Sequence, residues 1–319
     1  MSEPRVPAAP RPSRRSALLL WVIAAVGLFV STAVFALLLL SIGDMNDQLL
    51  MLIDALIYYL PFLALPVYLV ARRAPGMWRS LRPYPVSIFS ALGIIALALA
   101  SVILMTNIVA LWTVVLEAVG LNGGGASLAV PADAPGLMLC ILHIAVLPAV
   151  CEEFLFRGVV LSAFERNGTR RAVAVSAVMF ALLHGSLSGL PAHLLLGLIL
   201  GALVVCCNSI YAGLIFHTTY NAATVMLASI AGRSADAASE SLPMLDVIGG
   251  PSGLLALMIE TLMLGAVVLF GLRLFARTAF LRGASFEPRR REPLRGSEWA
   301  LLAVGLVLVS LLFIVQELI

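Results

Sequence analysis

The sequence contains no lysine and few charged residues of any kind. Charged side chains occupy only 12% of the 319 positions, whereas 61% of the residues are hydrophobic and the mean hydropathy is +1.06. Soluble domains are about half apolar and about a quarter charged, so this composition excludes an ordinary soluble protein. The net charge is only +3, which gives no indication of a nucleic-acid partner.

Cysteine is scarce as well, and the short motifs of the common hydrolases are missing. The four cysteines form no CxxC pair or zinc-ribbon spacing, and they lie in or beside apolar runs: Cys140, Cys151, Cys206 and Cys207. We interpret them as small apolar residues of helices. The sequence also lacks an HExxH zinc-protease motif and a GxSxG nucleophile motif. These absences argue against a disulfide scaffold, a thiolate zinc site and both motif-bearing hydrolase classes.

Long apolar stretches make up most of the chain. A membrane-spanning helix needs about 20 mostly apolar residues, and such stretches lie near 17–42, 49–71, 86–116, 137–164, 171–188, 190–208, 210–230, 253–275 and 299–318. The sequence therefore predicts an all-α fold, a polytopic transmembrane helix bundle of about nine spans. The first stretch exceeds the core of a signal peptide, which has about 7–15 residues, so we expect a retained span.

The arginines divide the connecting loops into two classes. Cytoplasmic loops of membrane proteins collect positive residues, whereas outer loops do not. With a cytoplasmic N-terminus only Arg233 falls outside, and the inner arginines are Arg5, Arg11, Arg14, Arg15, Arg72, Arg73, Arg79, Arg82, Arg157, Arg166, Arg170, Arg171, Arg273, Arg277, Arg282, Arg289, Arg290, Arg291 and Arg295. The opposite loops contain Asp44, Asp47, Asp133, Asp236, Glu240 and Asp246. This alternation predicts nine spans and a cytoplasmic N-terminus.

The chain divides into a short tail and one membrane domain. Residues 1–16 are rich in Pro and Arg and lack an apolar face, so we expect a disordered cytoplasmic tail. Residues 17–319 form the predicted membrane domain, in which we find no soluble domain, cofactor-binding loop or convincing internal repeat. The function must therefore lie among the helices.

Ionisable and amide side chains within the predicted spans are few, and each one needs a reason. A charged side chain at the centre of a membrane helix costs about 2.5–3.5 kcal/mol on insertion scales. The residues of this kind are Asp54, His143, Glu152, Glu153, Arg157, His184, His193, His217, Asn221 and Glu260. Several of them belong to pairs with a four-residue spacing.

The first pair lies in the segment CEEFLFRG. Glu153 and Arg157 are four residues apart, so they share one helical face and are close enough to pair. Glu152 points about 100° away from that face. One carboxylate is therefore neutralised locally, and the other is free to face a partner on a different helix.

Two further pairs show the same spacing on later helices. They are Phe180 with His184 in FALLHG, and His217 with Asn221 in HTTYN. At about 1.5 Å per residue, Glu152 and His184 each lie about 18 Å from the cytoplasmic ends of their helices, and the last pair lies about 10–15 Å from its own. The three helices are therefore predicted to bring their polar faces to one level below the cytoplasmic surface.

A cluster of this kind suits hydrolysis by an activated water. Glu152 is a candidate to accept a proton from water, and His184 to orient that water or share the role of base. His217 and Asn221 are candidates to donate hydrogen bonds to the oxyanion that forms when water attacks a carbonyl. One good donor of this kind contributes about 3–4 kcal/mol.

The residue types also leave a metal route open. Arg157 is expected to hold Glu153 ionised and to fix the helix. The carboxylates and imidazoles together also provide a ligand set for Zn²⁺, which would itself acidify a bound water. In that alternative the ligands are Glu152, His184 and His217. Residue types alone do not choose between the glutamate route and the zinc route.

A serine nucleophile is the remaining alternative near His184. Ser186 and Ser188 follow it in the segment GSLSG, where a nucleophile would need a neighbouring base. Glycines at both ends of the segment are more typical of a turn. We therefore interpret these serines as turn residues.

The three spacings, in this order on separate helices, resemble the motifs of a known family. They are similar to the motifs of the CPBP family, which includes the Ras-converting CAAX endopeptidase, bacterial Abi proteins and bacteriocin self-immunity proteins. The motifs that carry the resemblance span about 150–222 and read Glu152-Glu153-x-x-x-Arg157, Phe180-x-x-x-His184 and His217-x-x-x-Asn221.

The resemblance implies an integral-membrane endopeptidase with a catalytic core at about 137–230 and a site open toward the cytoplasmic side. By this likeness Glu152 is the catalytic glutamate, His184 positions its water, and the third motif lies on the oxyanion side. The family has been described both as metalloproteases and as metal-independent glutamate proteases. The expected partners are the lipid bilayer and a membrane-anchored or membrane-proximal peptide, and we expect a multi-pass protein of a bacterial plasma membrane.

The other buried polar residues allow different interpretations. We interpret His143 and His193 as structural, because neither has a partner at the motif spacing. Asp54 and Glu260 are compatible with a structural role or with a substrate path. A proton-coupled transporter would use Asp54, Glu152 and Glu260, but we find no internal repeat symmetry of the kind it predicts. A non-catalytic membrane partner, acting in immunity or as a scaffold, would not need the Glu152 carboxylate.

Overall fold

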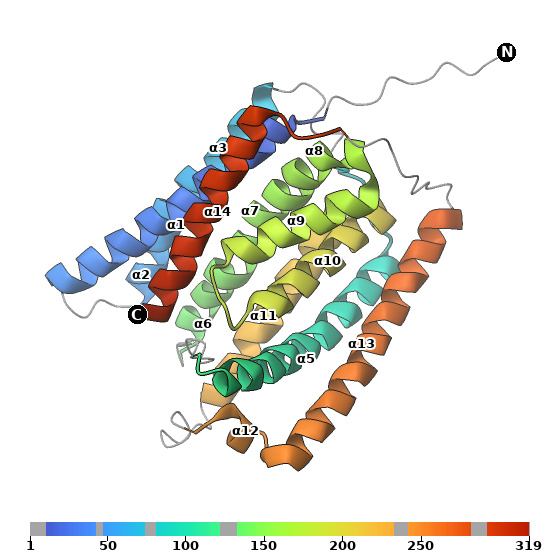
Figure 1. Cartoon of the computed structure of the whole chain (residues 1–319). Helices are drawn as coiled ribbons and strands as arrows, with labels where there is room; N and C mark the ends of the chain where they lie inside the picture. The colour runs from blue at the N-terminus through green and yellow to red at the C-terminus, as the bar shows by residue number, and fades with distance from the viewer. Residues whose placement is uncertain are drawn as a thin grey trace.

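The computed structural model describes residues 11–42, 47–73, 81–121, 133–232, 242–281 and 292–318, and every regular element within these ranges is a helix (Figure 1). The prediction of an all-α helix bundle is confirmed. Residues 1–10 of the expected tail lie outside the described ranges. So do several residues used for the topology: Asp44, Arg79, Arg233, Asp236, Glu240, Arg282, Arg289, Arg290 and Arg291.

The helices follow the predicted spans, and two of the spans consist of several joined segments. In chain order the elements are α1 (Arg14–Ile42), α2 (Asp47–Asp54), η1 (Ala55–Ala64), α3 (Leu65–Arg73), α5 (Ile88–Ala118), α6 (Ala134–Cys140), η2 (Ile141–Val146), α7 (Leu147–Glu152), η3 (Glu153–Leu161), α8 (Ser162–Phe164), η4 (Glu165–Asn167), α9 (Thr169–Leu183), α10 (Leu190–Cys207), α11 (Ile210–Gly232), α12 (Met244–Val247), α13 (Gly250–Leu281) and α14 (Gly296–Leu318).

Both joined rods contain π-helical turns, in which backbone hydrogen bonds span five residues. In the rod formed by α2, η1 and α3, the π segment η1 contains Pro61, whose nitrogen has no hydrogen to donate to the preceding turn. The rod from α6 to η4 is π-helical in η2 and again in η3, which begins directly after Glu152. Such turns are rare in proteins overall, but those that occur often lie at functional sites. The second one falls where the two predicted carboxylates lie.

Within the described residues, seven helices are long and apolar enough to cross a membrane. The predicted spans at 171–188 and 210–230 are not among them. In the first, α9 ends at Leu183 after only 15 residues. In the second, α11 has 23 residues and is long enough, but the polar run HTTYN lowers its mean hydropathy. The chain is an integral multi-pass membrane protein, while the count of nine crossings and the cytoplasmic N-terminus stay predictions.

The segments from α6 to α11 form the centre of the bundle (Figure 1). Helices α1, α2, α3 and α14 lie on one side of this centre, and α5 and α13 lie on the other. Within the centre, α9 and α10 approach closely at Gly197, where an added Cβ would lie 2.8 Å from the Cα of Ala177. The absence of a side chain at Gly197 thus permits this packing.

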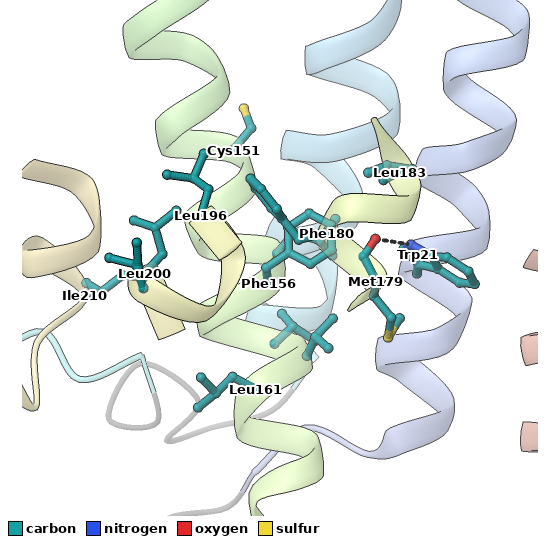
Figure 2. Close-up of a cluster of buried hydrophobic side chains, with 14 of the residues drawn as sticks. Trp21, Cys151, Phe156, Leu161, Met179, Phe180, Leu183, Leu196, Leu200 and Ile210 are labelled. Carbon is teal, nitrogen blue, oxygen red and sulfur yellow. Dashed lines mark hydrogen bonds between the residues drawn. The ribbon is translucent and has the colours of Figure 1, made fainter. Parts of the chain in front are cut away.

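Large apolar side chains fill the space between η3, α9 and α10 (Figure 2). Phe156, Phe180 and Leu200 are fully buried there. Trp21 joins α1 to this core, because its indole Nε1 donates to the carbonyl of Met179 at 3.0 Å. Close packing of such side chains, rather than their removal from water, holds membrane helices together, so the core keeps these helices in a fixed register.

Ion pairs connect separate segments at one end of the bundle. Arg82 pairs with Glu165 at 2.6 Å, and Arg11 reaches the same carboxylate at 3.3 Å. Arg14 pairs with Glu298 at 3.2 Å and so joins α1 to α14. Three arginines that were predicted to share the cytoplasmic side therefore lie at the same end, which we call the arginine end.

Candidate active site

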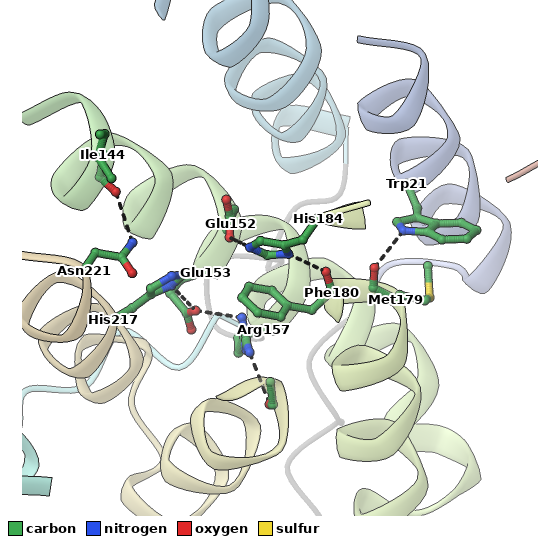
Figure 3. A network of polar contacts seen from close by, with 11 residues as sticks. Trp21, Ile144, Glu152, Glu153, Arg157, Met179, Phe180, His184, His217 and Asn221 are labelled. Carbon is green, nitrogen blue, oxygen red and sulfur yellow. Dashed lines mark hydrogen bonds and ion pairs between the residues drawn. The ribbon is translucent and has the colours of Figure 1, made fainter. Parts of the chain in front are cut away.

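Glu153, Arg157 and His217 form a buried network at the centre of the bundle (Figure 3). Oxygen Oε1 of Glu153 accepts from Nη1 of Arg157 at 2.7 Å and lies 3.0 Å from Nδ1 of His217. The side chains of Glu153 and Arg157 are both 0% exposed. Because a carboxylate only accepts, Nδ1 carries the hydrogen, and Nε2 of His217 is left for other contacts. The four-residue spacing produces the predicted ion pair, and α11 adds a third member.

Further contacts hold this network in place. Nη2 of Arg157 donates to the carbonyl of Gly197 at 3.2 Å, and its guanidinium lies 4.6 Å from the ring centroid of Phe180. On α11, Gly213 leaves room for the carboxylate, because an added Cβ would collide with Glu153. A buried charge is costly unless it is paired and hydrogen-bonded. The network therefore fixes η3, α9, α10 and α11 relative to one another.

Glu152 and His184 face each other across a gap. Oε2 of Glu152 lies 4.0 Å from Nε2 of His184, which is beyond hydrogen-bond distance. The other nitrogen, Nδ1, contacts the carbonyl of Phe180 at 2.8 Å. Because a carbonyl only accepts, this bond places the hydrogen of a neutral His184 on Nδ1 and leaves Nε2 as an acceptor. The second motif therefore acts through the backbone of Phe180 and directs the imidazole at the carboxylate.

Asn221 lies one helical turn beyond His217 on α11. Its Nδ2 donates to the carbonyl of Ile144 in η2 at 3.1 Å. A side-chain amide carries two hydrogens on its nitrogen, so a second one remains for another acceptor. The third motif thus ties α11 to the rod that carries both carboxylates.

A cavity of about 340 Å³ unites four of the six predicted residues. They are Glu152, His184, His217 and Asn221. The other lining residues are Tyr59, Ile144, Pro148, His193, Leu196, Tyr220 and Thr224. Glu153 and Arg157 do not line the cavity and lie behind its wall. The volume is within the range of about 300–1,000 Å³ that is typical of ligand sites.

Packed side chains lie between the buried network and the arginine end. Leu161, Leu200 and Ile210 lie on η3, α10 and α11 between the network and that end, and each is at most 2% exposed. In the opposite direction the lining continues along the helices to Ile144 and Thr224. The cavity therefore extends from Glu152 between η2 and α11, away from the arginine end.

The residues expected as zinc ligands do not form a metal site in the described ranges. Within them, no group of three or more His, Cys, Asp or Glu side chains is arranged to hold a metal ion. A zinc site needs three or four protein ligands. We therefore assign no step of the reaction to zinc.

Buried polar residues outside the motifs have separate surroundings. Asp54 pairs with Nε2 of His143 at 3.3 Å and accepts from the hydroxyl of Ser31 at 2.8 Å. This second cluster joins α1, α2 and η2. Glu260 is exposed on α13 and does not line the cavity. No disulfide joins the four cysteines, all of which lie in the described ranges.

The segment GSLSG forms the turn between α9 and α10. Oγ of Ser186 accepts from the backbone nitrogen of Gly189 at 3.0 Å and lies 3.2 Å from Oγ of Ser188. These bonds are local, as in other turns that serine side chains stabilise. The geometry supports the interpretation of both serines as turn residues.

Seven residues of the cavity wall were not among the predicted site residues, and His193 and Tyr59 are two of them. His193 stacks on His184 with ring centroids 4.0 Å apart, and Tyr59 reaches the cavity from η1. The available signal for His193 was a lone polar residue in the apolar helix LPAHLLLGLILGALVV. Its partner lies on another helix, so no spacing along one helix could reveal the contact.

Comparison with known proteins finds a similarity to a protease family. Residues 134–223 match the family model described as type II CAAX prenyl endopeptidase Rce1-like. The matched range contains all six predicted site residues, and it confirms the resemblance drawn from the three motifs. No curated protein and no solved structure shows a significant match to the chain. The family match supports a protease of the CAAX endopeptidase kind in general.

Proposed function

We propose that this chain is an intramembrane endopeptidase that hydrolyses a peptide bond with a water held between Glu152 and His184. The observation that carries the proposal is the 4.0 Å gap between their Oε2 and Nε2 atoms, in the wall of a cavity among the helices. Both groups present an acceptor to this gap, so a water there can donate one hydrogen to each. A water held by two acceptors is oriented so that one of them, acting as a general base, can accept its proton during hydrolysis.

The reaction begins when the Glu152 carboxylate accepts a proton from this water. The water oxygen forms a bond to the substrate carbonyl carbon, and the electron pair of the C=O bond moves onto the carbonyl oxygen. His184 holds the water by its second hydrogen. As the tetrahedral intermediate collapses, the C–N bond breaks and the proton on Glu152 passes to the leaving nitrogen. A carboxylic acid and an amine are the products.

The third motif faces the oxyanion that forms in this step. The second hydrogen of the Asn221 amide is available to it, because only one is needed for the carbonyl of Ile144. His217 donates from Nε2 when its imidazole is protonated, and Glu153 stabilises that cation at Nδ1. Donors placed in advance where charge develops are usually the largest contribution to such catalysis.

The substrate must reach the depth of Glu152. This residue lies 13 positions before Glu165 in the rod, which corresponds to about 20 Å from the arginine end. We propose a peptide that is anchored in or close to the bilayer, as the CAAX endopeptidase likeness suggests, and cleavage within a bacterial plasma membrane. Because packed side chains lie between the network and the arginine end, the peptide in this proposal enters along η2 and α11, where the cavity extends.

A cleavage assay with purified full-length protein in liposomes tests the proposal. Membrane-proximal peptides with and without a lipid anchor are incubated with wild type, Glu152→Gln and His184→Ala, with and without a chelator. We expect wild type to cleave at least one peptide and both variants to lose at least about 100-fold in rate. Glu260→Gln is the matched control, because it changes an exposed carboxylate outside the cavity.

Three outcomes oppose the proposal. Equal rates in wild type and Glu152→Gln would remove Glu152 from the reaction. Complete loss of cleavage in the chelator, with recovery on adding Zn²⁺, would replace the glutamate route with the metal route. A protein that acts only as a scaffold would cleave no peptide, and Glu152→Gln would not change its function in the cell.

A further inference from the structure

His193 contributes a second ring against the imidazole of His184. The two imidazoles are stacked, with centroids 4.0 Å apart and planes inclined by 24°. Phe180 contributes another ring at 4.6 Å with an inclination of 54°. His184 therefore contacts one ring from its own helix and one from α10, in addition to the hydrogen bond at Nδ1.

We infer that His193 is a positioning residue for the proposed protease. A single hydrogen bond at Nδ1 leaves the imidazole free to tilt about that bond, and a tilt would turn Nε2 away from Glu152. Stacking on a second ring fixes the plane of the imidazole and so keeps Nε2 directed across the gap. This inference rests on the proposed function, and it adds a residue that lies outside all three motifs.

The surroundings of His193 are shaped to admit its ring. An atom added as Cβ at Gly189 would lie 2.6 Å from Cε1 and 2.9 Å from Nδ1 of His193. The φ angle of Gly189 is −82°, which any residue adopts without strain. Gly189→Ala would therefore leave the backbone relaxed and press on the imidazole of His193.

One nitrogen of His193 provides a way to separate stability from positioning. Nδ1 is buried without a hydrogen-bond partner in the described structure, and an unsatisfied buried nitrogen lowers stability. His193→Phe removes this nitrogen and keeps a flat ring on His184. His193→Ala removes both the nitrogen and the ring.

Steady-state kinetics of the full-length protein in liposomes test the inference, with a peptide that wild type cleaves. We expect His193→Ala to lower kcat by about tenfold or more with KM within about twofold, because a small misplacement of a catalytic group has effects of this size. His193→Phe should stay within about threefold of wild type. Its unfolding temperature should be at least that of wild type. A kcat of His193→Ala within about twofold of wild type, or equal losses in the Ala and Phe variants, would overturn the inference.

Gly189→Ala supplies an independent arm. It should lower kcat by itself, and the double variant with His193→Ala should be no slower than His193→Ala alone, since the small side chain leaves room for the new methyl group. If the kcat losses of the two single variants multiplied in the double variant, Gly189→Ala would not act through the ring of His193.

Chemical labelling gives a readout that needs no substrate. Diethyl pyrocarbonate modifies accessible imidazoles, and mass spectrometry follows His184 with His143 as the internal reference. We expect faster labelling of His184 in His193→Ala but not in His193→Phe. Unchanged labelling in the Ala variant would refute the contact even if the protein is a protease. If wild type cleaves nothing, the proposed function fails while the labelling still decides the contact.

Discussion

Nδ1 of His217 lies 3.0 Å from Oε1 of Glu153, although the two residues are 64 positions apart in the sequence. The contact joins the first motif to the third, and the same oxygen also accepts from Arg157. The two adjacent carboxylates therefore differ in environment. The carboxylate of Glu153 is bound within the network, whereas the carboxylate of Glu152 faces the cavity.

Glu153→Gln should destabilise the protein strongly. The variant keeps the shape of the side chain but leaves the guanidinium of Arg157 without a compensating charge in the core. Removing one partner of a buried ion pair typically costs about 3–5 kcal/mol in the free energy of unfolding. Equilibrium unfolding of the purified protein in detergent micelles measures this loss.

Glu152→Gln is the matched control for that experiment. Its carboxylate has no ion pair within hydrogen-bond distance in the described structure, so the free energy of unfolding should change by less than about 1 kcal/mol. Equal destabilisation by the two substitutions would show that the carboxylates do not have the separate roles described above.

Gly197→Ala should weaken the packing of α10 on α9. The new methyl group would lie 2.8 Å from the Cα of Ala177 and would force the backbones apart. Overpacking of this kind costs about 1–3 kcal/mol, and the carbonyl of Gly197 would also move relative to Arg157. Thermal unfolding should show a lower midpoint, whereas Gly265→Ala, with no atom within 4 Å of the added Cβ, should change little. Identical midpoints for both variants would count against the close approach.

Asp54→Ala should loosen the attachment of α2 to η2. It leaves His143 and Ser31 without their shared partner, and an unsatisfied buried polar group costs about 1–3 kcal/mol. Since Asp54 does not line the cavity, kcat of the remaining folded protein should stay within about threefold of wild type. Chemical unfolding and cleavage kinetics check the two parts. A proton-coupled transport role would instead show as loss of ion-dependent uptake with unchanged stability.

The arrangement within each helix could be predicted from the sequence because it depends on helical spacing alone. Glu153 and Arg157 are four residues apart and form the expected pair. The apolar stretches likewise predicted the all-helical bundle. The roles assigned to the six site residues stay predictions, since the distances show proximity rather than chemistry.

Contacts between helices could not be predicted in this way. The stacking of His193 on His184 depends on the turn at 184–189 and on the register of α10, neither of which a periodicity reports. The partner of Asp54 lies on a rod that begins about 80 residues later in the chain. The π-helical turns could not be predicted from the spacing either, because local propensity alone favours α-helical bonds.

A double-mutant cycle on Glu152 and His184 tests the central claim most directly. The kcat values of wild type, Glu152→Gln, His184→Gln and the double variant are compared on one cleaved peptide in liposomes. We expect each single variant to lose at least about 100-fold and the double variant to be about as slow as the slower single variant, because both residues act on one water. Losses that multiply, or a Glu152→Gln enzyme that keeps more than about a tenth of the wild-type kcat, would contradict the account.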